Sequence, residues 1–285
     1  MNDIVKYDNR MNLLKFKGMT KVDMNIFISL CSRLKGKGEE EIEITFEEIK
    51  ILSQYTSTAK SDFLKALDDM IQRLQKVNSK IITNDEICYF VIFPTFKVNP
   101  KTELVRIGVN KDFMFLLNDL KAFTRFELAE FVELESKYTK NLYRLLKQFR
   151  TTGKFVVDDI TDFMEKLDSP ELYGVREFNR FVLEVAIKEL QEKKMFNNLV
   201  CSQIKAKKRG SPVVGYIFTF DREEIPEQTE PKGSKKEGSH SSKPKETPKK
   251  NNNTNNRFNN FPQRECTFED IAEMERLLLN RKPII

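Results

Sequence analysis

Arginine and asparagine side chains crowd the start of the segment "YGVREFNRFVLEVAIKELQEKK", which covers residues 173–194 and is otherwise rich in apolar residues. The planar fork of an arginine can donate to O6 and N7 of guanine together. Arg176 and Arg180 are therefore candidates for reading DNA bases, and Asn179 near the helix start could reach adenine or a phosphate. The alternative is a solvated helix face whose charges pair with one another.

A helix is predicted over this segment because its polar and apolar residues separate at about 100° per residue. The polar stripe contains Arg176, Glu177, Arg180, Glu184, Lys188 and Gln191. The residues expected to be buried are Phe178, Phe181, Val182, Val185, Ala186 and Leu190. The helix is thus expected to be covered on three sides and to expose one narrow strip.

A basic turn follows this helix within "NLVCSQIKAKKRGSPVVGYIFTF", which is predicted to form a β-hairpin. The tip of the hairpin holds Lys205, Lys207, Lys208 and Arg209. Cations on such a turn suit contacts with phosphates beside a groove, although basic turns are also often only solvated. A polar helix start followed by a basic wing favours DNA binding more than either feature alone.

The elements that would position these residues occur twice. The first copy consists of the helix "TKVDMNIFISLCSRLK" capped by Thr20, the strand "EIEIT", the helix "FEEIKILS" capped by Thr45, the helix "AKSDFLKALDDMIQRLQK" and the β-rich stretches "KIIT", "EICYFVIFPTFKV" and "ELVRIGV". The second consists of the helix "YTKNLYRLLKQFR", a turn at Gly153, the strand "KFVV", the helix "ITDFMEKL" after Asp159, the helix described above and its hairpin. Each copy has the order of a winged helix-turn-helix.

Equivalent positions of the two copies lie at a nearly constant offset, 114 residues from Thr45 to Asp159 and 115 from Phe63 to Phe178. We therefore predict an α+β chain with two tandem winged-helix domains related by internal duplication, the alternative being two unrelated α+β domains. The predicted segments are an N-terminal winged-helix domain for dimerisation and auxiliary DNA contact (1–115), a C-terminal winged-helix domain that is the main DNA reader (116–225), a disordered linker (226–264) and a short amphipathic helix (265–285).

The first copy is expected to be the weaker DNA reader, because Asp68 and Asp69 on its second helix would repel phosphates. The residues predicted to make auxiliary backbone contacts are Lys60, Lys65 and Lys76. The stretch "EICYFVIF" is too apolar for an exposed sheet edge without a partner. It predicts either dimerisation through this β region or an internal core strand.

The tail has a different composition. From Pro226 to Arg264 there is no Val, Ile, Leu or Met, so the segment cannot bury enough surface to offset its ordering entropy. Residues 231–285 carry +5 of the net charge of +6, so any nucleic-acid surface on the folded part must be a local patch. Helical periodicity returns in "TFEDIAEMERLLLN". Roles as a DNA tether or as a spacer for this helix both fit the linker.

Residue usage argues against most enzyme classes. The only histidine is His240, which removes histidine-based zinc sites and Ser–His or Cys–His nucleophiles, and no phosphate-binding G-x-x-x-x-G-K-[ST] loop occurs. We expect no catalysis, no metal and no cofactor. Four isolated cysteines suggest reduced thiols, and neither a secretion signal nor an apolar run of about 18 residues is present. These features predict a cytoplasmic protein without a membrane partner.

Three segments, "MTKVDMNIFISLCSRLK", "ELESKYTKNLYRLLKQFRTTGKF" and the terminal "MERLLLNRK", resemble the RepB-type initiator proteins of theta-replicating plasmids. The resemblance covers about residues 1–222. It implies two winged-helix domains, monomers that bind direct repeats (iterons) of double-stranded DNA at the origin, and dimers that repress their own promoter. It also implies opening of an adjacent AT-rich region and recruitment of host initiator and helicase in a bacterial cytoplasm, without catalysis by the initiator.

By this resemblance the second domain is the main base reader, with Arg176, Asn179 and Arg180 at the start of its recognition helix. The residues expected to contact phosphates from the preceding helix are Tyr138, Lys140, Arg144 and Lys147. Packing is the alternative for the tyrosine, and a solvated face is the alternative for the lysines. Two winged helices in successive major grooves would cover about two turns of DNA.

Three other functions are compatible with the sequence. The nearest is a winged-helix transcriptional repressor without a replication role, which would bind a promoter but no repeats beside an AT-rich segment. The second is a scaffold whose winged helices bind protein, which would show no affinity for DNA. The third is a nicking enzyme with a tyrosine nucleophile and a carboxylate-held metal, which the single histidine disfavours.

Overall fold

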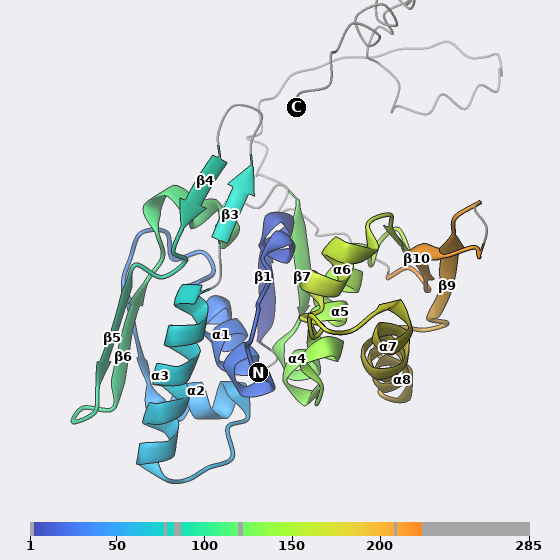
Figure 1. Cartoon of the computed structure of the whole chain (residues 1–285). Coiled ribbons are helices and arrows are strands. Elements are labelled where there is room, and N and C mark those ends of the chain that lie inside the picture. The colour runs from blue at the N-terminus through green and yellow to red at the C-terminus, as the bar shows by residue number, and fades with distance from the viewer. Residues whose placement is uncertain (1–2, 77–78, 83–86, 119–121, 208–209, 224–285) are drawn as a thin grey trace, which may run out of the picture. The chain divides into compact units, whose positions relative to one another are not determined.

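The computed structural model describes residues 3–76, 79–82, 87–118, 122–207 and 210–223 (Figure 1). All of them belong to the unit Met1–Gln228. The predicted linker 226–264 and the predicted terminal helix 265–285 lie outside the described residues.

The described chain contains both helices and strands (Figure 1). Those of the first half are β1 (Ile4–Asp8), the 3₁₀ turn η1 (Asn9–Leu13), α1 (Lys21–Leu34), β2 (Ile42–Thr45), α2 (Phe46–Ser53), α3 (Lys60–Lys76), β3 (Ser79–Ile82), β4 (Ile87–Phe90), β5 (Thr95–Asn99), β6 (Leu104–Gly108) and the 3₁₀ turn η2 (Lys111–Leu116). Those of the second half are β7 (Phe123–Glu127), α4 (Leu128–Glu133), α5 (Lys137–Gln148), β8 (Lys154–Val157), α6 (Ile160–Lys166), α7 (Val175–Phe178), the π-helical turn η3 (Asn179–Leu183), α8 (Glu184–Glu192), β9 (Val200–Lys205) and β10 (Val213–Thr219).

The two halves share one topology, which confirms the predicted pair of winged-helix domains. Their three-stranded sheets have the orders β2-β6-β5 and β8-β10-β9, so in both the first strand pairs with the last. In both, two helical elements follow the first strand, α2 and α3 in one half and α6 and α7–α8 in the other. The hairpin β3–β4 is an addition to the first half, where it forms a separate two-stranded sheet.

Local capping explains where several helices begin. Thr20 and Asp23 form a capping box at α1, since the Thr20 side chain accepts from the Asp23 N–H and Asp23 accepts from the Thr20 N–H. The Thr45 hydroxyl caps α2 by accepting from the Glu48 N–H at 3.1 Å. Asp159 caps α6 through the N–H groups at 161 and 162. Thr45 and Asp159, which the offset between the two copies places at equivalent positions, thus cap equivalent helices in the two domains.

A strand pair that the sequence did not predict joins the N-terminal segment to the region before α4. β1 runs antiparallel to β7, with Ile4 opposite Glu127 and Asp8 opposite Phe123. β7 follows the last strand of the first winged helix and precedes α5 of the second. Its pairing with a strand more than a hundred residues away makes this segment part of a sheet.

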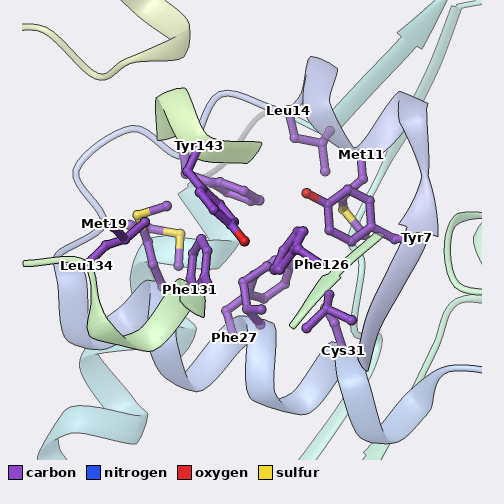
Figure 2. Close-up of a cluster of buried hydrophobic side chains, with 14 of the residues drawn as sticks. Tyr7, Met11, Leu14, Met19, Phe27, Cys31, Phe126, Phe131, Leu134 and Tyr143 are labelled. Atoms are coloured by element: carbon purple, nitrogen blue, oxygen red, sulfur yellow. The ribbon is translucent and has the colours of Figure 1, made fainter. Parts of the chain in front are cut away.

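Buried aromatic side chains attach α5 to β7 and α4. Figure 2 shows the ring of Tyr143 beside those of Phe126 and Phe131. Tyr143 stands edge-on to Phe126 with ring centroids 5.2 Å apart, and it also contacts Phe196, which follows α8, at 5.8 Å. α5 is therefore held both by β7 and α4, which precede it, and by the turn after the last helix.

A second aromatic core fixes the sheet and helices that carry the expected reading surface. Phe163 of α6 lies at its centre and is 2% exposed. Its ring contacts those of Phe155, Phe178, Tyr216 and Phe218, at centroid distances of 5.8–6.2 Å. β8, β10 and α7 thus all pack against the side chain of Phe163.

Candidate nucleic-acid interface

The predicted polar stripe exists on the helical segment formed by α7, η3 and α8. Its exposed side chains are Arg176, Arg180, Glu184, Lys188 and Gln191. Phe178, Val182, Ala186 and Leu190 are buried on the opposite side, as predicted. The second helix of the helix-turn-helix therefore presents both candidate arginines to solvent, as base reading in a major groove requires.

Two apolar residues predicted to be buried are exposed on this helix. Phe181 and Val185 keep 47% and 45% of their accessible surface. The cause is the π turn η3, in which the Glu184 N–H donates to the Asn179 carbonyl five residues earlier. The extra residue in that turn rotates the following residues away from the regular wheel by up to about 100°. The exposed face is consequently wider than predicted and partly apolar.

Asn179 faces the domain more than it faces solvent. Its side-chain oxygen accepts a hydrogen bond of 2.7 Å from the hydroxyl of Tyr216 on β10. A two-point contact with adenine needs both the oxygen and the nitrogen of the amide. The hydrogen bond therefore orients Asn179 toward β10 and helps to position α7–α8, and contact of Asn179 with adenine or a phosphate stays a prediction.

A carboxylate of α8 anchors the helix at its other end. Glu189 accepts from the backbone N–H groups of Glu135 at 2.5 Å and Ser136 at 3.3 Å. These N–H groups lie at the start of α5, where unpaired donors and the helix dipole favour a negative charge. The reading helix is thus fixed to α5, which in turn is fixed to the first half.

The predicted wing is the hairpin β9–β10. The Ala206 N–H donates to the Pro212 carbonyl at 2.9 Å and closes its tip. Lys205 and Lys207 are exposed. Lys208 and Arg209, which were predicted to lie beside them, fall outside the described residues. The described part of the tip carries the cations expected for phosphate contact.

The three cations predicted to contact phosphates from α5 point inward. Lys140 and Arg144 are at most 1% exposed and Lys147 is 5% exposed. The Lys140 amino group donates to the Phe131 carbonyl at 2.5 Å, at the end of α4. In this conformation none of the three side chains can reach a phosphate, so we withdraw the predicted DNA contacts. Tyr138 is half-buried against the core, which agrees with the packing alternative.

These cations instead link segments that are distant in sequence. The Arg144 guanidinium donates to the Met11 carbonyl and to Asn141, and it lies 4.4 Å from the centre of the Phe16 ring. The Lys147 amino group lies 2.6 Å from Glu223 and 3.2 Å from Glu130. A polar helix stripe that looked solvated is therefore part of the interior.

The buried position of Lys140 predicts a pH dependence of stability. Burial lowers the pKa of Lys140 from 10.5 to about 7. Between these values the unfolded chain binds more protons than the folded chain, so Lys140 makes the free energy of unfolding rise with pH. The slope is at most about 1.4 kcal/mol per pH unit. Urea unfolding at pH 7–10 should show this slope in the wild type and lose it in Lys140→Met.

The exposed Lys154 provides the matched control for this experiment, since Lys154→Met removes a lysine without removing a buried amine. Its unfolding should keep the wild-type slope. An unchanged slope in Lys140→Met would mean that the buried amine stays charged throughout the range.

The auxiliary contacts predicted on α3 are placed unevenly. Lys65 is exposed, while Lys60 lies 2.7 Å from Glu103, and the hydrogen bond from Lys60 lowers the pKa of Glu103. The side chain of Lys76 lies outside the described side chains. A charge already neutralised by a carboxylate contributes less to phosphate binding, so Lys65 is better placed than Lys60.

The wing of the first domain was not among the predicted DNA contacts. The hairpin β5–β6 occupies the place in the sheet that β9–β10 occupies in the second domain. It exposes Lys97 on β5 and Lys101 in the turn that follows. The signal in the sequence was the shared order of elements in the two copies, which gives the last hairpin of the first copy the place of the basic wing.

Two absences concern only the part of the chain that the structure describes. Its His, Cys, Asp and Glu side chains form no group of three or more that could hold a metal ion. Its helices include none with the length and apolar character needed to cross a membrane.

Comparison with known proteins gives matches to both halves. Residues 4–147 match the family described as "Initiator Replication protein, WH1", and residues 159–220 match "Initiator Rep protein, WH2". The "Probable replication protein rep" of Bifidobacterium longum (strain NCC 2705) is 33% identical over 231 residues, covering 79% of this chain and 75% of that protein. The Pi initiator protein, crystallised with iteron DNA, shares the fold with a TM-score of 0.59 at 16% identity, covering 79% of this chain and 99% of that chain.

Proposed function

This chain belongs to the family of initiator replication proteins with WH1 and WH2 domains, and on that premise we propose that it initiates plasmid replication by binding direct repeats at an origin. The observation that carries the DNA-binding part is the exposed Arg176–Arg180 pair at the start of the reading helix, beside the basic wing. Arginine forks suit guanine in the major groove, and lysines at a wing tip suit the adjacent phosphates.

The proposal includes two further steps of initiation and one regulatory role. Binding promotes opening of an adjacent AT-rich region, and the bound protein recruits host initiator and helicase in the bacterial cytoplasm. The protein itself performs no catalysis; the family match supports this part. As a dimer the protein represses its own promoter.

Dimerisation is assigned to the β3–β4 hairpin. An isolated two-stranded hairpin is marginal in water, and Val91 directly after β4 is 48% exposed. Pairing with a second copy would cover this apolar surface. Sedimentation analysis over a range of protein concentrations measures the association.

A DNase footprint on the DNA flanking the gene of this protein tests the proposal. Protection of several direct repeats, each about two turns long and beside an AT-rich stretch, is the expected result. Protection of a single inverted repeat at the promoter would leave only the transcriptional repressor. The absence of any footprint at low salt would refute DNA recognition and favour a scaffold that binds protein.

Replacing Lys207 with alanine should weaken binding to all DNA sequences alike. A phosphate contact carries no sequence information, and its loss reduces the number of counterions released, by about one unit in the salt slope. Affinity measured at several salt concentrations gives this slope. Lys111, whose charge is already paired with Glu39, is the control, and Lys111→Ala should leave the slope unchanged. An unchanged slope in Lys207→Ala would remove the wing from the interface.

A further inference from the structure

An apolar patch lies on the reading helix among its cations. Phe181 and Val185, both nearly half exposed, occupy consecutive turns of the helix. Leu172, which is 97% exposed, and Tyr173 precede the helix, and the Tyr173 ring lies 5.9 Å from that of Phe181. Apolar side chains placed together in this way on a surface indicate a binding partner.

The charges around the patch indicate which partner. The Arg180 guanidinium lies 5.2 Å from the centre of the Phe181 ring, and Arg176 and Lys188 are exposed on the same helix. A second apolar protein surface would have to desolvate these cations, whereas a polyanion compensates them. The patch is also continuous with the proposed DNA-reading stripe. Its occupant is therefore expected to be DNA.

One group on the floor of the major groove is apolar. Thymine presents a C5-methyl group there, and apolar side chains distinguish it from the other bases by contact. The π turn η3 brings Phe181 and Val185 onto the face that also carries Arg180. In a regular helix Val185 would turn toward the core, so this face depends on the π turn.

We propose that Phe181 and Val185 read thymine through its C5-methyl group, next to the bases read by Arg176 and Arg180. This inference rests on the proposed function, since it names the base that the same helix recognises. It predicts that each repeat contains thymines whose methyl groups, and not their hydrogen-bonding groups, contribute to specificity.

Replacement of single thymines by deoxyuridine tests the proposal, because deoxyuridine lacks only the methyl group. Duplexes carrying one repeat, defined by the footprint, would each have one thymine replaced, and the affinity of the full chain would be measured. We expect a loss of about fourfold at one or two positions, the effect of exposing one methyl-sized group. Elsewhere in the repeat the replacement should have no effect.

The same duplexes tested with Phe181→Ala and Val185→Ser complete the experiment. At the position read by each residue, the variant should bind thymine and deoxyuridine equally well, because the partner of the methyl group is gone. Ile51 of α2 is the matched control, as it is also apolar and is 69% exposed. Ile51→Ala should keep the wild-type preference for thymine.

The possible outcomes separate this inference from the proposed function. If the wild type shows no preference for the repeats over random DNA, the proposed function fails. If it prefers the repeats but tolerates deoxyuridine at every position, the proposed function stands and thymine reading is overturned. If Phe181→Ala and Val185→Ser keep the wild-type preference for thymine over deoxyuridine, or change only the self-association of the protein, thymine reading is likewise overturned.

Discussion

Replacing Arg176 and Arg180 together with alanine is expected to reduce affinity for the repeats by about thirtyfold or more. Each two-point contact between arginine and guanine contributes about 1–3 kcal/mol of discrimination, so two contacts contribute about 2–6 kcal/mol. Both side chains are exposed, so the loss should come from DNA contact and not from unfolding. Titration of a labelled repeat and of random DNA at one fixed salt concentration measures the difference.

Substitution of the same two residues with lysine is the matched control. Lysine keeps the charge but lacks the planar fork, so the double lysine variant should retain affinity for random DNA while losing preference for the repeat. Equal losses on repeat and random DNA in both variants would show that the two arginines bind only the backbone.

Replacing Phe163 with alanine is expected to lower the free energy of unfolding by about 3–5 kcal/mol, the usual cost of deleting a buried phenyl ring. The side chain is 2% exposed and contacts four aromatic rings from β8, α7 and β10. Its loss should therefore leave a cavity where three elements meet. Urea unfolding followed by circular dichroism measures the change, which suits a chain without tryptophan.

Phe181→Ala provides the contrast within the same domain. Phe181 is 47% exposed and contacts Tyr173, so its removal should change stability by far less than the loss of Phe163. Phe163→Ala should alter unfolding and Phe181→Ala should alter DNA affinity. A stability loss of similar size in both variants would mean that the reading helix is packed more tightly than its exposure indicates.

Features that depend only on neighbouring residues could be predicted from the sequence. Thr20, Thr45 and Asp159 cap helices as predicted, because a capping hydrogen bond closes within three residues. The order of elements and the repeat followed from periodicity and offset. The same local reasoning placed Arg176 and Arg180 on the exposed side of the reading helix.

Helical periodicity did not predict the burial of a polar helix face that is covered by a segment distant in sequence. Lys140, Arg144 and Lys147 recur at helical spacing on α5 and were predicted to contact phosphates from its surface. In the fold they bond to Phe131, Met11 and Glu223, the last two more than 70 residues away. The pairing of β1 with β7 is equally non-local. Such contacts depend on how the two halves pack together, which no window of sequence contains.

One part of the DNA-reading surface could be predicted from the sequence, and another part is seen only in the fold. The arginines of this surface and its basic wing were predicted from the residue types. The hydrogen bond between Asn179 and Tyr216 and the exposure of Phe181 and Val185 were not predicted and are seen in the structure. Phe181 and Val185 face outward because η3 is a π turn, in which the Glu184 N–H donates to the Asn179 carbonyl. The extra residue of this turn breaks the regular 100° spacing that a helical wheel assumes.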